Sequence, residues 1–236
     1  MLAFVRCIAG AQGFDDPVSK KVVDLGASPF YRPQQNRRVE LRCYFYSRFF
    51  VKELDSGAKG ADYLAIVPSQ GGMEECKVPR SPGEIRVDDW GYYGDAKGNF
   101  VFFVAADGTN GGLPFGVYEA RRGKKLFEDS DALSYWITGR HERGALKVIH
   151  STSDGITIRY LRVVESECDL HLDADRCWKE VRAKYGIVAT GPPRCSGYDE
   201  VHTSLVSSVA YPVEVTLPAP AKVNPVEGQV YCWPVD

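Results

Sequence analysis

Hydrophobic residues recur along the chain in short runs of strand length, and most runs are separated by turns that contain glycine or proline. In 39–46, for example, Leu41, Cys43 and Phe45 alternate with other residues, as in a strand with one buried face. Such runs predict a mainly β fold of antiparallel sheets, either a sandwich or a propeller-like arrangement. The predicted strands are 39–46, 49–54, 63–67, 99–105, 115–120, 124–128, 145–150, 156–164, 213–217 and 229–233.

One segment, 173–185, has helical periodicity instead. Asp173 and Asp175 stand at its start, where carboxylates cap free N–H groups and oppose the helix dipole, and Gly186 can end it. The apolar face of the predicted helix consists of Ala174, Trp178, Val181 and Tyr185.

The proline-containing segment 12–38 is predicted to be an extended lead-in.

The segment 117–127 reads Val-Tyr-Glu-Ala-Arg-Arg-Gly-Lys-Lys-Leu-Phe and resembles the outer hairpin of a PQQ-type propeller blade. Phe127 stands where the blade has tryptophan, and the pattern has no second clean copy in the chain. The resemblance implies two strands joined by a tight turn. The chain as a whole, with 97–130 as its most distinctive part, also resembles uncharacterised secreted bacterial proteins. That second resemblance implies no particular activity.

The chain contains seven cysteines and, near its start, the tripeptide Ala9-Gly10-Ala11, which has the small-residue pattern of a secretory cleavage site. Cleavage there would remove Cys7 and leave an even number of cysteines, which suits an oxidising compartment. We therefore expect residues 1–11 to be a signal-peptide remnant, and 12–236 to be a single disulfide-stapled domain outside the cytoplasm. The alternative is a cytoplasmic protein whose first strand is Ala3–Ile8. The remaining cysteines are Cys43, Cys76, Cys168, Cys177, Cys195 and Cys232.

The cysteine spacing leaves the connectivity open, because six cysteines allow 15 pairings. A Cys43–Cys76 bridge would pin the glycine- and proline-rich loop that contains Cys76 to the first predicted strand. Cys177 would staple the predicted helix through a bridge to either Cys168 or Cys195.

Charge and motifs exclude several functions. The net charge is −2 and the sequence pI about 6.1, without the basic stripe that nucleic-acid binding needs. No apolar run approaches the ~20 residues of a membrane helix, so we expect no membrane span. The chain has no Walker A, G-x-G-x-x-G, G-x-S-x-G, H-E-x-x-H or C-x-x-C motif. We therefore expect no organic cofactor.

A divalent cation is the one cofactor that the sequence suggests. Asp169, His171, Asp173 and Asp175 alternate with other residues and would share one face of an extended segment, where their oxygen and nitrogen atoms could ligate a metal. The alternative is that Asp173 and Asp175 cap the helix while the other two lie in solvent.

Aromatic residues form a second candidate site. Trp90, Tyr92, Tyr93 and Trp136 would make a glycan- or peptide-binding platform if their rings were exposed, and would be ordinary core if buried.

The loop between two predicted strands at 107–112 is a third candidate, because Asp107 and Asn110 offer oxygen ligands. Its alternative is a glycine-rich hairpin connection.

The leading functional hypothesis is a secreted or periplasmic binding or envelope-associated module that recognises a glycan, a peptide or an envelope component. One alternative is an extracytoplasmic hydrolase with a non-local site that uses His150 or His171 with nearby carboxylates. Another is a purely structural envelope protein.

Overall fold

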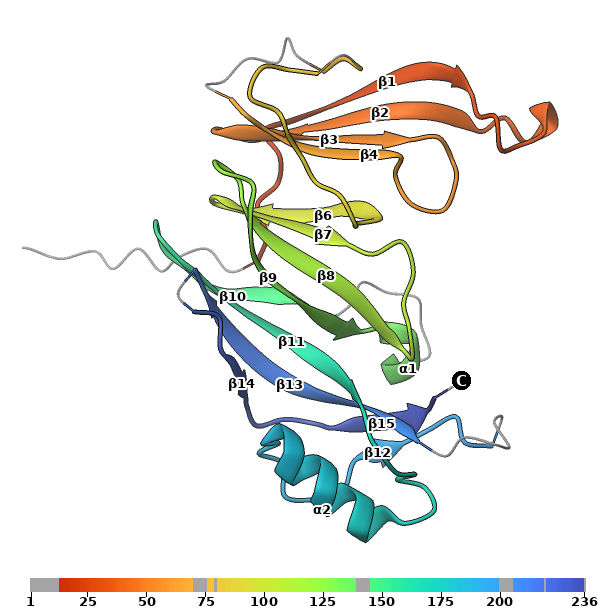
Figure 1. Cartoon of the computed structure of the whole chain (residues 1–236), viewed down its shortest axis with the longest axis vertical. Helices are drawn as coiled ribbons and strands as arrows, with labels where there is room; N and C mark the ends of the chain where they lie inside the picture. The colour runs from red at the N-terminus through yellow and green to blue at the C-terminus, as the bar shows by residue number, and fades with distance from the viewer. Residues whose placement is uncertain are drawn as a thin grey trace, which may run out of the picture.

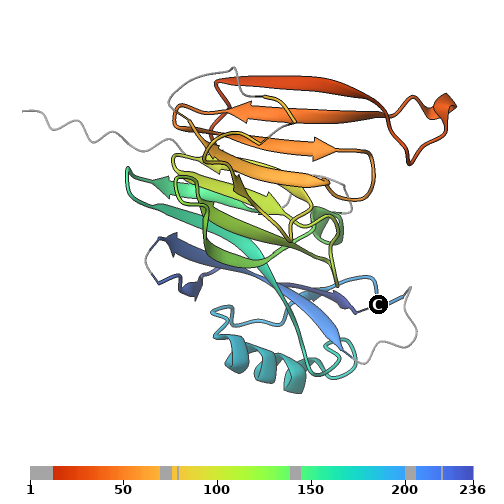
Figure 2. The same cartoon turned by 45° about the horizontal axis from the view of Figure 1, so that its top comes forward.

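The computed structural model describes residues 13–69, 76–78, 80–138, 145–199, 206–218 and 220–235. It confirms a mainly β fold of largely antiparallel sheets with one substantial helix. Figures 1 and 2 show two sheets that pack on one another, with that helix against the far end of the second sheet. The helical elements are η1 (Pro33–Gln35), α1 (Ser134–Thr138) and α2 (Ala174–Tyr185).

The first sheet has five antiparallel strands, whose order in space is their order in the chain. They are β1 (Ser19–Ala27), β2 (Arg38–Phe45), β3 (Phe49–Asp55), β4 (Tyr63–Pro68) and β5 (Ile85–Arg86).

The second sheet has ten strands, and its main path runs in the order β12-β15-β13-β11-β9-β8-β7-β6. Only the β12–β15 pair is parallel, while β10 pairs with β11 and β14 with β13. The strands are β6 (Tyr92–Lys97), β7 (Phe100–Val104), β8 (Gly112–Glu119), β9 (Lys124–Ala132), β10 (Lys147–Ser151), β11 (Ile156–Glu165), β12 (Arg194–Cys195), β13 (Ser207–Leu217), β14 (Val223–Pro225) and β15 (Tyr231–Pro234).

The prediction of an extended lead-in over 12–38 missed a strand, because Ser19–Ala27 forms β1 of the first sheet. This strand lies at the edge of the first sheet and pairs with β2. None of its side chains is fully buried, so the sequence lacks the apolar alternation that announces a half-buried strand.

The two sheets share a core. Phe49 and Val51 of β3 pack with Val101 and Phe103 of β7 between the sheets. Phe50 points to the outer face of the first sheet and belongs to a separate cluster there. Both faces of β3 are therefore covered, which explains why its apolar residues are nearly continuous instead of alternating.

The opposite face of β7 contributes Phe100 and Phe102 to the largest core cluster, which also contains Trp178 and Val181 of α2. The helix was predicted correctly and ends at Gly186 in the left-handed conformation (φ +66°). The capping prediction was wrong in detail. Asp173 occupies the N-cap position but makes no side-chain cap hydrogen bond.

Three disulfides link Cys43 to Cys76, Cys168 to Cys177, and Cys195 to Cys232. The first pairing was predicted, and the second was one of the two alternatives for Cys177. Residues 1–12, with the expected cleavage site, lie outside the described part of the chain. Within the described part, no helix is long and apolar enough to cross a bilayer.

Candidate functional site

The described residues of the predicted aromatic platform make contacts with neighbouring strands. Trp90 donates a hydrogen bond from Nε1 to the hydroxyl of Tyr118 at 2.8 Å, and Tyr92 accepts one from the backbone N–H of Gly60 at 2.9 Å. All three platform residues on this segment, including Tyr93, are partly buried. They serve contacts within and between the sheets. The side chain of Trp136, in α1, lies outside the described part of the structure.

Tyr93 lies in a tyrosine cluster between the sheets. Its hydroxyl forms a hydrogen bond with that of Tyr46, and its ring centroid is 4.5 Å from that of Tyr44. Burial raises the pKa of Tyr93, and burial together with the nearby Glu53 carboxylate raises the pKa of Tyr44 to about 12. These phenols therefore stay protonated at physiological pH, and those of Tyr46 and Tyr93 hydrogen-bond to each other between the sheets.

The loop that contains Asp107 and Asn110 is held by contacts to other segments. Asp107 forms an exposed ion pair with Lys59. The carbonyl of Asn110 accepts a hydrogen bond from Nε1 of Trp233 at 3.0 Å, and its amide donates to Glu165. This loop, which connects β7 to β8, is thus held to strands β11 and β15.

The four predicted metal ligands do not converge. Oδ1 of Asp169 accepts hydrogen bonds from the backbone N–H groups of His171, at 2.6 Å, and Leu172, at 3.2 Å. Asp173 pairs with Arg176 at 2.6 Å, and Asp175 follows on the exposed first turn of α2. Among the residues that the structure describes, no group of three or more His, Cys, Asp or Glu side chains could hold a metal ion.

Neither histidine of the hydrolase hypothesis has an acidic partner in the described structure. His150 is exposed on β10, and the ring of His171 stacks on Tyr198 with centroids 4.8 Å apart. Within the described residues, no hydrogen bond or ion pair joins either imidazole to a carboxylate.

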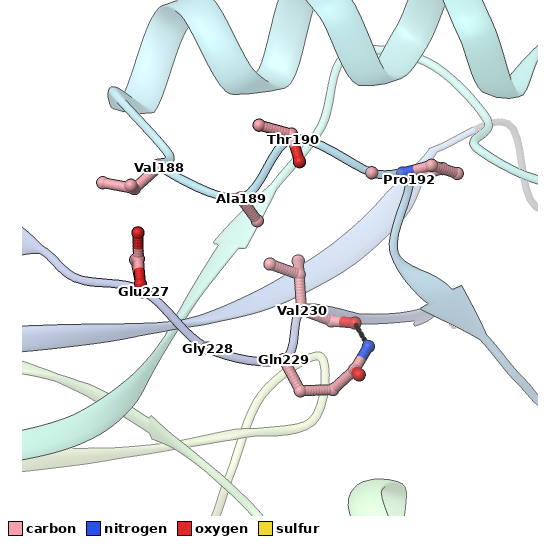
Figure 3. A pocket seen from close by; sticks show the side chains of 9 residues that line it. Val188, Ala189, Thr190, Pro192, Glu227, Gly228, Gln229 and Val230 are labelled. Atoms are coloured by element: carbon pink, nitrogen blue, oxygen red, sulfur yellow. Dashed lines mark hydrogen bonds between the residues drawn. The ribbon is translucent and has the colours of Figure 1, made fainter.

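A concave site that the sequence did not predict lies elsewhere, between the segment that follows α2 and the segment that precedes β15 (Figure 3). We call this cavity the slot. Its volume is about 400 Å³, which is within the usual range for small-ligand sites. It is lined by Val188, Ala189, Thr190, Gly191, Pro192, Glu227, Gly228, Gln229 and Val230.

One wall of the slot, 188–192, is held at both ends. Upstream, the side chain of Ile187 is buried directly after Gly186 ends α2, and its N–H donates to the carbonyl of Arg182. Downstream, the chain enters the short strand β12, which is tied to β15 by the Cys195–Cys232 disulfide.

The other wall, 227–230, is an excursion between two strands that both pair with β13. The N–H of Val226 donates to the carbonyl of Pro212 at 3.0 Å. The backbone of Gly228 lies so close to Pro212 that a Cβ there would approach the proline Cγ to 2.8 Å. Glycine thus allows this wall to lie directly on β13.

The two walls are paired at one end and unpaired at the other. The N–H of Arg194 donates to the carbonyl of Val230 at 3.0 Å, where the parallel β12–β15 pairing begins. Upstream, none of the backbone N–H groups of 188–191 or of 227–228 hydrogen-bonds to another described residue. Uncompensated backbone groups of this kind are satisfied by water or by a ligand.

The side chains give the slot distinct ends. In Figure 3 the carboxylate of Glu227 points toward Val188 at one end, and the hydroxyl of Thr190 points into the gap. Ala189 and Val230 contribute apolar surface between them. The slot can therefore accept backbone-like hydrogen-bonding groups, a small apolar side chain and a positive charge near Glu227.

No residue of the slot was predicted from the sequence. The glycine- and proline-containing run at 190–193 is typical of a loop, and nothing in it indicates which other segment it faces. No family model matches the chain, and neither do any of the curated proteins or solved structures compared with it.

Proposed function

We propose that the protein is a secreted or periplasmic, disulfide-stabilised binding module whose slot holds a short extended peptide. The observation that carries this proposal is the open end of the β12–β15 pair, where the backbone N–H groups of 188–191 and 227–228 make no hydrogen bond to a described residue. An extended peptide presents N–H and C=O groups at strand spacing, and addition of such a strand to unpaired backbone is a recurring mode of recognition.

Glu227 favours a peptide with a positive charge at one end. Its carboxylate is exposed at the end of the slot near Val188, and no ion pair with a described cation occupies it. A free α-amino group or a lysine side chain would supply the complementary charge. The volume of about 400 Å³ suits a few residues rather than a folded partner.

The extracytoplasmic location is supported by the three disulfides, since such bonds persist in oxidising compartments and are rare in the cytosol. Its test is the intact mass of the protein expressed in a secreting host, before and after reduction and alkylation. We expect six cysteines that alkylate only after reduction. Free thiols in the untreated protein would contradict the location.

Peptide binding is tested by titrating isotope-labelled protein with a pooled tetrapeptide library that has free amino termini, and by recording amide chemical shifts. We expect saturable shifts concentrated at 188–191 and 227–230. The same library with acetylated amino termini, and the Glu227→Gln variant, should bind several-fold more weakly. Glu180→Gln, an exposed carboxylate change on α2, is the matched control and should leave binding unchanged.

The masses of the peptides after incubation separate binding from hydrolysis. Unchanged masses are expected for a binding module, and cleaved products would favour the hydrolase hypothesis. An absence of slot-specific shifts at millimolar peptide would contradict the proposal.

A further inference from the structure

Strand β1 is a long outer edge of the first sheet. It pairs with β2 on one side, and no other described strand pairs with it. Both views place β1 at the outer margin of the molecule, away from the second sheet (Figures 1 and 2). The outward backbone groups of an edge strand form a ready template for another strand.

The side chains along this edge are unusually apolar for exposed positions. Val18, directly before β1, is 80% exposed, and Val22 and Leu25 are 50% and 41% exposed. Lysines are a common means of protecting such an edge, and Lys20 and Lys21 are both exposed here. On the same face as Lys20, however, Asp24 carries the opposite charge four residues further along the strand.

We propose that β1 pairs antiparallel with β1 of a second copy of this chain, about a two-fold axis that runs midway between the two copies of Val22. Directly opposed residues in an antiparallel pair lie on the same face of a sheet, so a two-fold axis perpendicular to the sheet must set one residue opposite its own copy. The axis then runs midway between these two copies, and each register is called here an axis through that residue. An axis through Val22 places Lys20 of each copy opposite Asp24 of the other.

The neighbouring registers lack this match. An axis through Val23 sets Val22 opposite Asp24, and an axis through Lys21 sets Lys20 opposite Val22. Only the Val22 register forms two opposite-charge pairs and also covers the exposed Val22 side chains with each other. The two five-stranded sheets then continue into one another across the dimer.

The monomer already holds both charged groups in place. The Nζ of Lys20 lies 4.8 Å from the ring centroid of Tyr44. The carboxylate of Asp24 accepts hydrogen bonds from Nε of Arg38 and from the backbone N–H of Gly26, at 2.9 Å in each case. Pairing with Arg38 lowers the pKa of Asp24, which therefore remains charged at neutral pH.

The test is sedimentation equilibrium of the full chain over roughly 10–500 μM, a range suited to weak association. We expect a reversible dimer. Lys20→Asp should raise the dissociation constant of the dimer by roughly tenfold or more, because two attractive charge pairs become repulsive. The double variant Lys20→Asp/Asp24→Lys should restore much of the loss. Lys21→Asp, which lies opposite Val23 on the other face, is the control and should have a smaller effect.

Denaturant unfolding of each variant shows whether it is folded, since Asp24→Lys also removes the contact with Arg38. A wild-type protein that is monomeric at the highest concentration would overturn the proposal. Equal weakening by Lys20→Asp and Lys21→Asp, or no recovery in a folded charge-swapped variant, would overturn the register.

Discussion

Lys52 and Glu84 form an ion pair inside the protein, with Nζ and Oε2 2.7 Å apart and side chains only 1% and 2% exposed. Lys52 projects from β3 onto the outer face of the first sheet, and Glu84 lies in the segment that covers this face. Nζ of Lys52 also donates to the carbonyl of Lys77, and Oε2 of Glu84 accepts from the N–H of Ser81. Together with the Cys43–Cys76 bridge, the pair fastens this covering segment to the sheet.

Removing one side chain of this ion pair should leave the other charge buried without its ion-pair partner. We expect Lys52→Met or Glu84→Gln to lower the free energy of unfolding by about 3–5 kcal/mol, because the remaining group loses its buried partner. The double variant Lys52→Met/Glu84→Met should be less destabilising than the sum of the single changes. Urea denaturation measures these values. Lys59→Ala, which breaks an exposed pair with Asp107, is the control and should be nearly neutral. A loss as small as the control's would mean that solvent reaches the buried pair.

The contact between Gly111 and Trp233 predicts a strong effect of a single methyl group. Gly111 has φ +81°, and a Cβ there would overlap the fully buried indole of Trp233. We expect Gly111→Ala to lower the free energy of unfolding by about 2–4 kcal/mol, through backbone strain and overpacking together.

Gly98→Ala is the matched control for Gly111→Ala, because Gly98 also has positive φ (+58°) but nothing lies within 4 Å of its added Cβ. Its loss should be about 1 kcal/mol, measured by the same denaturation experiment. Similar losses for both variants would show that strain alone accounts for the effect and that the indole moves aside.

Local patterns were sufficient to predict most of the strands. The β8–β9 hairpin, for example, follows from apolar runs on either side of a turn that ends at Gly123, which has φ +61°. Strand β1 was missed because an edge strand buries few side chains. The burial of Lys52 was also invisible, since it depends on a covering segment about thirty residues downstream.

The candidate site could not be predicted for a related reason. The two walls of the slot are joined by the pairing of Arg194 with Tyr231, which are 37 positions apart in the chain. Neither wall contains a motif, and its unpaired N–H groups belong to the backbone, which leaves no signature in side-chain identity. Conversely, Trp90 and Tyr93 were conspicuous in the sequence because the core between the sheets requires large side chains.

Asp131 should make stability depend on pH. Its carboxylate accepts hydrogen bonds from the N–H groups of Leu146 and Leu161, yet burial dominates and raises its pKa to about 6. The folded protein therefore binds this proton more tightly than the unfolded chain, whose Asp pKa is about 3.9. The ionised carboxylate consequently lowers stability as the pH rises from about 4 to about 6.

The Asp131→Asn variant isolates this contribution. The difference in unfolding free energy, wild type minus Asp131→Asn, should fall by about 2–3 kcal/mol between pH 4 and pH 7, whatever its value at pH 4. Urea denaturation at several pH values measures it. Asp154→Asn, in an exposed turn, is the control and should leave the difference from wild type nearly constant. A difference for Asp131→Asn that does not change with pH would mean that its pKa is ordinary in the folded protein.

The Cys195–Cys232 disulfide should matter more for the slot than for the rest of the fold. It joins residues 37 positions apart, whereas Cys168 and Cys177 are nine apart, so loop entropy predicts stabilisations of about 4 and about 3 kcal/mol respectively. These values differ little, but of these two bridges only Cys195–Cys232 fixes β12 against β15 at the paired end of the slot.

Replacing both Cys195 and Cys232 by serine should therefore weaken tetrapeptide binding by roughly tenfold, because the walls would have to be ordered by the ligand itself. The matched variant has serine at 168 and 177. It should unfold at a slightly higher urea concentration than the variant with serine at 195 and 232, and it should retain most of the wild-type affinity for tetrapeptide. Amide-shift titrations, performed where both variants are folded, measure the comparison. Equal loss of binding in the two variants would show that general destabilisation, rather than the geometry of the slot, controls the affinity.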